Sequence, residues 1–210
     1  MKRVYGFNEG GKELIDILGG KGGNLAEMKR IGLPIPEGII VSTTACKEFF
    51  RDGKKITPEL EKEILEKLEY LQEITGKRFE GDNPLLVSVR SGAPISMPGM
   101  MDTILNLGLN DVTAEKMSKI FNDEIFVHEL YTRFIQMFSE IVMGIEKELF
   151  FSLKEKLFAE RKDEPKIDTY KLIIKSFDIN NNWFIYTFLT GRNMYFCIKK
   201  RIAFARCVFI

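Results

Sequence analysis

The chain has 210 residues, of which 45% are hydrophobic and 29% are charged, a composition typical of a folded globular protein. Its 31 basic and 30 acidic residues nearly cancel, which excludes a global electrostatic field that would attract nucleic acid or an anionic membrane. Three cysteines without CxxC spacing and a single histidine exclude a Cys/His zinc site, so we expect a reducing, cytoplasmic setting. No segment is apolar for long enough to predict a signal peptide or a membrane span.

The first 110 residues alternate short apolar runs with helical patterns and Gly or Pro breaks, which predicts an α/β arrangement. We expect a short strand over residues 4–7 and a buried strand over residues 39–41. Between them, a helix should begin near Asn24 and end at Gly32, because the prolines that follow cannot continue it.

Two further helices are predicted after the second strand. The first begins with a hydroxyl cap, for which the candidates are Ser42, Thr43 and Thr44. It ends at Gly53. The second has a cap at Thr57, a proline at its first helical position and an end at Gly76. The apolar positions on this second helix are Leu60, Ile64, Leu65, Leu68 and Leu71.

An apolar run over residues 85–89 predicts a buried strand, followed at its carboxyl end by Arg90, Ser91 and Gly92. Loops at that end of the strands are where open α/β sheets bind ligands. The sequence therefore predicts that Arg90 lies on a ligand-facing loop.

The pattern changes to successive helices from Thr113 onward, and one apolar stripe holds Val127, Leu130, Tyr131, Phe134, Phe138, Ile141 and Val142. Composition changes again near residue 176. The last 35 positions contain nine aromatic residues, against fifteen in the preceding 175, and Asp178 is their only acid. We therefore expect an α/β subdomain over 1–110, a helical subdomain over 111–175 and a divergent aromatic, basic tail over 176–210.

The segment Gly-Gly-Lys-Gly-Gly-Asn at residues 19–24 surrounds Lys21 with four glycines just before the predicted helix. Glycines let the backbone approach a ligand closely, and a helix N-terminus offers free N–H groups to an anion. The spacing fits neither a Walker loop nor a dinucleotide fingerprint, because Gly22 and Leu25 occupy positions where those motifs need Ser/Thr and glycine. Spacing alone leaves open a phosphate site or a plain flexible turn.

The second cluster runs from Ser88 through Arg90 into the methionine-containing segment 96–103. An arginine beside a Gly/Ser loop can form bidentate hydrogen bonds with phosphate oxygens. The methionines beside the Pro98–Gly99 turn are typical of an adaptable surface. The alternative is an ordinary surface arginine on a loop.

Two other reactive residue types have simple structural interpretations. His128, the single histidine, lies beside the helical apolar stripe, which predicts a surface or boundary residue. Cys46 lies on a helix next to phenylalanines, which predicts a small core residue rather than a nucleophile.

Three longer strings carry a family resemblance: LGGKGGNLAEMKRIGLPIPEGIIVST, DNPLLVSVRSGAPISMPGMMDTILNLGLND and RFIQMFSEIVM. Together they resemble the N-terminal nucleotide-binding domain of the pyruvate, phosphate dikinase family. The resemblance covers roughly residues 3–150 with nearly fixed spacing.

The resemblance implies an ATP-grasp fold, with an inserted helical subdomain, that binds MgATP and passes a phosphoryl group to a histidine on a separate domain. Complete family members convert ATP, phosphate and pyruvate to AMP, diphosphate and phosphoenolpyruvate, and are expected to be homodimers. The catalytic contacts with the nucleotide phosphates are assigned by resemblance to Lys21 and Arg90. The residues implied to bind or lie near the nucleotide are Gly20, Lys21, Gly22, Arg90, Ser91, Met101, Asp102 and Thr103.

The sequence departs from the family in length. We expect the second half of the ATP-grasp unit, which would supply the Mg²⁺ ligands, and the later domains to be absent. The segment from about Ser176 is interpreted as a truncation or a shifted reading frame. ATP is then the expected partner, with pyruvate and phosphate reached only through the absent domains, and no nucleic acid or membrane is expected.

Three functions remain open at this stage. The first is a kinase fragment that binds ATP and lacks turnover of its own. The second is a non-catalytic nucleotide-binding or partner-dependent module that uses its tail as a contact surface. The third is a fragment of a related enzyme, such as a phosphoenolpyruvate synthase, or one that uses water or a glucan as acceptor.

Overall fold

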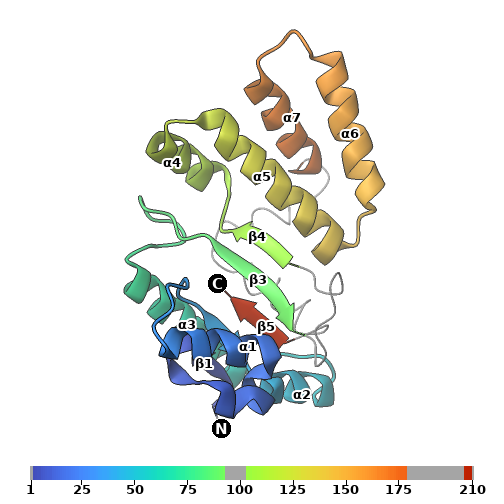
Figure 1. The fold of residues 1–210 in the computed structure, drawn as a ribbon. Helices are drawn as coiled ribbons and strands as arrows, with labels where there is room; N and C mark the ends of the chain where they lie inside the picture. Colours follow the sequence, from blue (N-terminus) through green and yellow to red (C-terminus); the bar gives the residue numbers. More distant parts are fainter. Residues whose placement is uncertain (1, 93–102, 179–205, 210) are drawn as a thin grey trace. The chain divides into compact units, whose positions relative to one another are not determined.

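The computed structural model describes residues 2–92, 103–178 and 206–209 (Figure 1). Its internal contacts divide the chain into two units. Unit 1 is Met1–Lys77, Val87–Thr103 and Phe196–Ile210, and unit 2 is Arg78–Leu86 and Ile104–Tyr195. This division is discontinuous in sequence, whereas composition predicts three consecutive segments.

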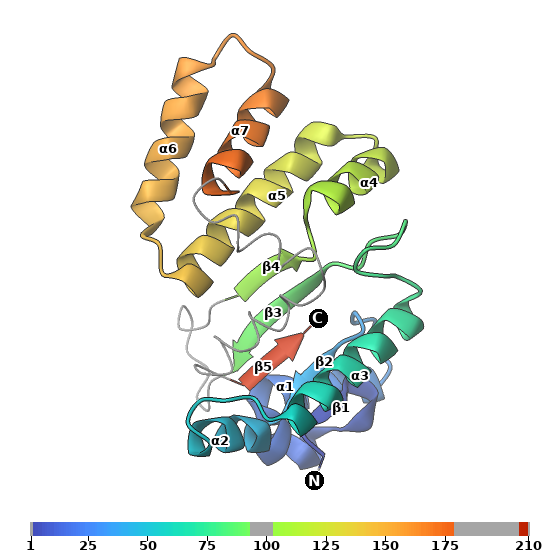
Figure 2. The same cartoon turned by 180° about the vertical axis from the view of Figure 1, so that it is seen from behind.

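The described residues of unit 1 contain four paired strands in the order β1-β2-β5-β3, and the three pairings among them are antiparallel. The strands are β1 (Val4–Gly6), β2 (Ile39–Val41), β3 (Val87–Gly92) and β5 (Arg206–Phe209). Figure 2 shows β5 between β2 and β3. The strands predicted over 4–7 and 39–41 are confirmed, with Phe7 opening a 3₁₀ turn, η1 (Phe7–Glu9).

Helices cover both faces of these strands, since Figures 1 and 2, seen from opposite sides, show α1 (Ile15–Arg30) in front in one view and α3 (Pro58–Thr75) in the other. Every residue of β2 is buried, at 0% exposure for Ile39 and Ile40 and 1% for Val41. Because side chains alternate between the two faces of a strand, a fully buried strand requires both faces to be covered. A mixed α/β unit is therefore confirmed.

Helix α3 (Pro58–Thr75) follows the predicted signals at both ends. The Thr57 hydroxyl accepts a hydrogen bond from the Leu60 N–H at 3.3 Å, and Gly76 ends the helix in the left-handed conformation, with φ 65°. The predicted apolar face is correct at four positions and wrong at Leu65, which is 50% exposed. Leu65 follows Ile64 directly, and adjacent helical residues are about 100° apart, so only one of the two can face the sheet.

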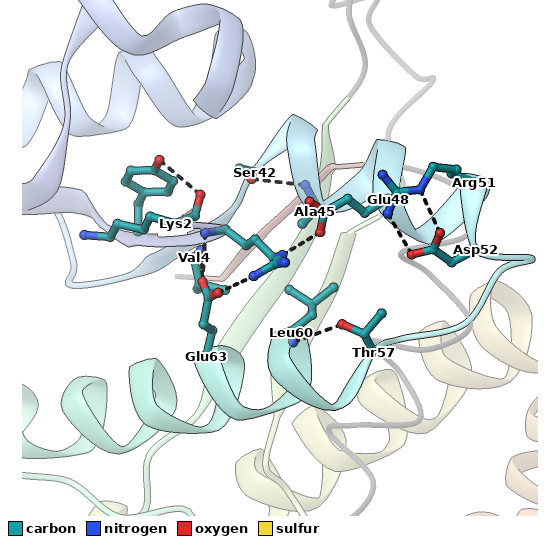
Figure 3. Close-up of polar contacts among 12 residues, drawn as sticks. Lys2, Val4, Ser42, Ala45, Glu48, Arg51, Asp52, Thr57, Leu60 and Glu63 are labelled. Carbon is teal, nitrogen blue, oxygen red and sulfur yellow. Dashed lines mark hydrogen bonds and ion pairs between the residues drawn. The ribbon is translucent and has the colours of Figure 1, made fainter.

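A carboxylate also ties α3 to β1 (Figure 3). Glu63 accepts hydrogen bonds from the backbone N–H groups of Arg3 and Val4 at 2.7 and 3.3 Å, and from the Arg3 guanidinium at 2.8 Å. The same guanidinium also pairs with Glu48 of α2 (Thr43–Arg51). Figure 3 also shows the cap of α2, where Ser42 accepts from the Ala45 N–H at 3.2 Å, as the sequence predicts.

The described residues of unit 2 include most of β4 (Thr103–Leu107), four helices and a π-helical turn, η3 (Ser139–Met143). The helices are α4 (Asp111–Phe121), α5 (Glu124–Phe138), α6 (Lys147–Glu160) and α7 (Lys166–Asp178). Helix α5 packs against α4 and α7 through buried Val127, Tyr131, Phe134 and Phe138, so the predicted apolar stripe forms the core at these positions. No helix in the described ranges combines the length and the apolar character needed to cross a bilayer.

Candidate anion-binding site

The glycine-rich segment lies inside a helix and does not precede one. Helix α1 spans Ile15–Arg30, so the prediction that the helix begins near Asn24 is wrong. A kink at Gly19 interrupts α1, with φ 75° and ψ 164°, a conformation that only glycine adopts without strain. Helical geometry therefore restarts at Gly20. The first N–H groups of a restarted helix lack their usual acceptors and suit an anion.

The glycines after the kink have different surroundings. A Cβ atom added at Gly22 would lie 3.0 Å from Ile40 Cγ2, so Gly22 allows α1 to pack closely on β2. A Cβ atom added at Gly20 would meet nothing within 4 Å. Close packing thus explains Gly22, and the tertiary contact overrides the poor helix propensity of glycine. It does not explain Gly20, which borders open space at the start of the helical segment.

Arg90 lies within strand β3 (Val87–Gly92) and not on a loop after it, so that prediction is wrong. The predicted strand begins too early because the Leu85 N–H bonds to the Arg78 carbonyl at 2.7 Å, which holds Leu85 in the preceding turn. The Arg90 side chain is partly exposed, but its Nε is buried and has no hydrogen-bond partner among the described residues. A buried guanidinium donor without an acceptor is costly, and an anion would satisfy it.

Lys21 lies close enough to Arg90 for their charges to interact. Burial lowers the pKa of Lys21 below its ordinary value of 10.5, and repulsion from the Arg90 guanidinium lowers it further. Packing of α1 against β3 brings these two residues together within unit 1. Two cations held together beside a helix start would be stabilised by a multiply charged anion such as a polyphosphate.

The other residues assigned by resemblance are only partly placed. Ser91 follows Arg90 within β3, and Thr103 begins β4 with a partly buried side chain. Met101 and Asp102 lie outside the described residues. The sequence interpretation did not assign a role to Gly19, although the kink there sets where the helical segment restarts. The Gly19-Gly20 pair was the available signal, because paired glycines are typical of breaks in regular structure.

Other polar features of the described residues do not extend this site. No group of three or more His, Cys, Asp or Glu side chains gathers to hold a metal ion in the described part of the chain. A cavity of about 790 Å³ in unit 2 is lined by α4, α5 and α7 and includes His128. Two of its four acids form ion pairs, Glu115 with Lys119 at 2.8 Å and Glu124 with Lys171 at 2.7 Å. His128 is partly exposed, and its Nδ1 lies 2.9 Å from the Glu124 carbonyl, as expected of a boundary residue.

Comparison with known proteins finds similarity to one enzyme family. Residues 15–72 match the family model described as pyruvate phosphate dikinase, AMP/ATP-binding domain. The chain is 51% identical over 164 residues to pyruvate, phosphate dikinase of Clostridium symbiosum, which covers 78% of this chain and 18% of that protein. The Entamoeba histolytica enzyme is 44% identical over 172 residues, covering 80% of this chain and 19% of that protein. The chloroplastic enzyme of Flaveria pringlei is 50% identical over 166 residues, covering 76% and 17%.

The matched family region begins at Ile15, the first residue of α1, and includes the kink at Gly19, Lys21 and most of α3. The matched region of the chain covers less than a fifth of the length of these relatives. It is therefore homologous to the pyruvate, phosphate dikinases, and residues 15–72 match the AMP/ATP-binding domain of that family.

Proposed function

We propose that unit 1 binds the polyphosphate group of ATP between the restarted helix of α1 and strand β3. Lys21 and Arg90 supply the positive charge, and the backbone N–H groups near Gly20 and Gly22 supply further donors. The observation that carries this proposal is the buried, unpartnered Arg90 Nε beside Lys21. The family match to an AMP/ATP-binding domain supports ATP as the nucleotide.

These residues bind and orient phosphate groups. Arg90 presents a planar fork of N–H donors to phosphate oxygens, whereas the Lys21 ammonium acts as a compact charge. Neither side chain is a nucleophile in this role, and charge stabilisation is the largest contribution that such groups make to phosphoryl transfer. The described residues contain no cluster of three or more His, Cys, Asp or Glu side chains that could hold Mg²⁺ beside these phosphate groups.

We further propose that the chain binds nucleotide and does not by itself complete the dikinase reaction. The relatives are five to six times longer than the matched region, so most of the residues of a complete dikinase have no counterpart in the match. The match of residues 15–72 to an AMP/ATP-binding domain is also compatible with a second candidate, a nucleotide-binding module without turnover. Unit 1 would then present bound ATP to groups supplied by other chain segments.

Isothermal titration calorimetry with ATP, with and without Mg²⁺, tests the binding proposal. We expect binding with a Kd on the order of 1 mM, since the proposed contacts are with the phosphate groups alone. Lys21→Ala and Arg90→Ala should each weaken it, while Lys62→Ala is the matched control, because Lys62 is 77% exposed on α3. No binding by the unmodified chain would contradict the proposal. Formation of AMP and phosphoenolpyruvate would contradict the claim that the chain lacks turnover.

A further inference from the structure

Strand β5 fills the gap between β2 and β3, although it comes from the divergent tail. It pairs Ile39 with Phe209 and Ile40 with Val208 on one side. On the other side it pairs Val89 with Phe209, Arg90 with Val208, Ser91 with Cys207 and Gly92 with Arg206. Neighbouring strands lie about 4.8 Å apart, so β2 and β3 are separated by about twice that distance, a space that one strand fills.

Val208 lies opposite two residues that matter for the candidate site. Ile40 is the residue on which α1 packs closely at Gly22, and Arg90 is the residue whose charge acts on Lys21. Side chains of directly opposed residues lie on the same face of a sheet, so Ile40 and Arg90 share the face that α1 covers. The row Ile40–Val208–Arg90 therefore connects the packing point of α1 with the guanidinium.

We propose that residues 206–209 are the positioning strand of the anion site, and that the gap between β2 and β3 is a strand-acceptor site for an extended segment. Recognition is by main-chain hydrogen bonds to both neighbours, as in β-augmentation. The occupant is the Arg206–Phe209 segment, paired antiparallel to each neighbour. Without it, β2 and β3 both present unpaired N–H and C=O groups toward the gap, and Arg90 loses the strand pairing that supports the packing of β3 against α1. The ligand part of this inference rests on the proposed function, and the strand part does not.

Proline substitutions in the full chain test the strand. N–H groups of consecutive strand residues point to opposite neighbours, so Cys207→Pro and Val208→Pro each remove a hydrogen bond to a different strand. Val208→Ile is the matched control, because it keeps the N–H and the β-branched side chain. We expect hydrogen exchange in β2 and β3 to accelerate at least tenfold in both proline variants, with α5 of unit 2 unchanged. Unchanged exchange in β2 and β3 would overturn the proposal.

Rescue in trans separates positioning from general destabilisation. A synthetic peptide with the sequence of residues 205–210, added in excess, should restore protection of β2 and β3 in the proline variants, and a scrambled peptide should not. It should leave the unmodified chain unchanged, because its acceptor site is filled. If α3 also loses protection in a variant, Val208→Gly is the milder replacement. If the peptide restores protection in none of the variants, the proposal is overturned.

Two measurements at the anion site report whether Arg90 has been displaced. Displacement of Arg90 should raise the pKa of Lys21, measured by the pH dependence of its reductive methylation, and the peptide should reverse this change. Affinity for inorganic tripolyphosphate should fall about tenfold in the proline variants and recover with peptide. If tripolyphosphate does not bind the unmodified chain, the proposed function fails, while exchange and peptide rescue still decide the strand. If β3 loses its protection while the pKa of Lys21 stays unchanged, residues 206–209 do not position Arg90 and that role is overturned.

Discussion

Lys21 on α1 and Arg90 on β3 are two cations held close together in unit 1, and the charge of Arg90 helps to lower the pKa of Lys21. Bringing two like charges together costs stability, because they repel each other. Perturbed groups of this kind are candidates for functional sites. A bound polyphosphate would reverse the effect, since its negative charge favours protonated Lys21.

The lowered pKa of Lys21 predicts how affinity depends on pH. Protonated Lys21 attracts phosphate, so its contribution is present below its pKa in the free protein and is lost as pH rises through that value. Because this pKa lies below 10.5, the loss begins at a lower pH than for an ordinary lysine. Lys21→Arg keeps its charge and should show flatter affinity for tripolyphosphate between pH 7 and 10.5 in calorimetric titrations. Identical pH profiles for the two proteins would exclude Lys21 from the site.

Gly20 and Gly22 form a matched pair for separating binding from folding. Alanine at Gly20 meets no neighbour, so Gly20→Ala should leave stability unchanged or raise it by up to about 1 kcal/mol. Alanine at Gly22 contacts Ile40 at 3.0 Å, and we expect a loss of about 1–3 kcal/mol in urea unfolding.

Gly20→Ala, the variant that keeps its stability, should lose ligand affinity. The methyl group of Gly20→Ala occupies the space beside the helix start, so tripolyphosphate affinity should fall about tenfold, or ~1.4 kcal/mol. Unchanged affinity of this stable variant would show that the anion does not approach Gly20.

The lowered pKa of Glu9 predicts that unit 1 loses stability at acidic pH. Burial would raise its pKa, but hydrogen bonds from Lys67 at 2.7 Å, from the Gly6 N–H at 2.6 Å and from Lys2 outweigh burial and hold the pKa at about 2. A carboxylate with a lowered pKa stabilises the fold above its unfolded pKa, near 4.5, and this stability is lost as pH falls toward 2.

Glu9→Gln removes this contribution. At pH 7 we expect the free energy of unfolding of the variant to be roughly 1–2 kcal/mol lower than that of the unmodified chain. This value is discounted because the Glu9 side chain is partly exposed to solvent. The difference from the unmodified chain should shrink as pH falls from about 4.5 toward about 2. Glu66→Gln is the control, because Glu66 is 63% exposed and 3.8 Å from Lys62. A difference that does not vary with pH would contradict the assignment.

Ile64 and Leu65 test the placement of α3. Ile64 is fully buried, so Ile64→Ala should cost about 2–5 kcal/mol through lost burial and a residual cavity. Leu65 is 50% exposed, and Leu65→Ala should change the unfolding free energy by less than about 1 kcal/mol. Equal costs in urea denaturation would mean that both residues face the core.

The elements that the sequence predicted well are those with local signals. The cap at Thr57, the following proline and Gly76 define α3 without reference to any other part of the chain. Ser42 and the apolar run over 39–41 define α2 and β2 in the same way. Local chemistry is sufficient in these cases, because caps and periodic burial act within a few residues.

The features that the sequence did not predict depend on tertiary contacts. Four glycines do not indicate a helix, and α1 includes them because Gly22 packs on Ile40. The position of Arg90 within β3 depends on pairing with β5, and no pattern in the tail predicts that pairing. The residues of the candidate site were found by resemblance, and their proximity is visible only in the folded unit.

A double-mutant cycle on Lys21 and Arg90 is the most direct test of a shared anion site. Tripolyphosphate affinity is measured by calorimetry for the unmodified chain, Lys21→Ala, Arg90→Ala and the double variant, with hydrogen exchange to confirm that β3 remains protected. We predict that each single variant loses about tenfold or more, and that the double variant loses less than the sum, because both contact one ligand. Two single variants that bind like the unmodified chain, or losses that add without coupling, would contradict the account.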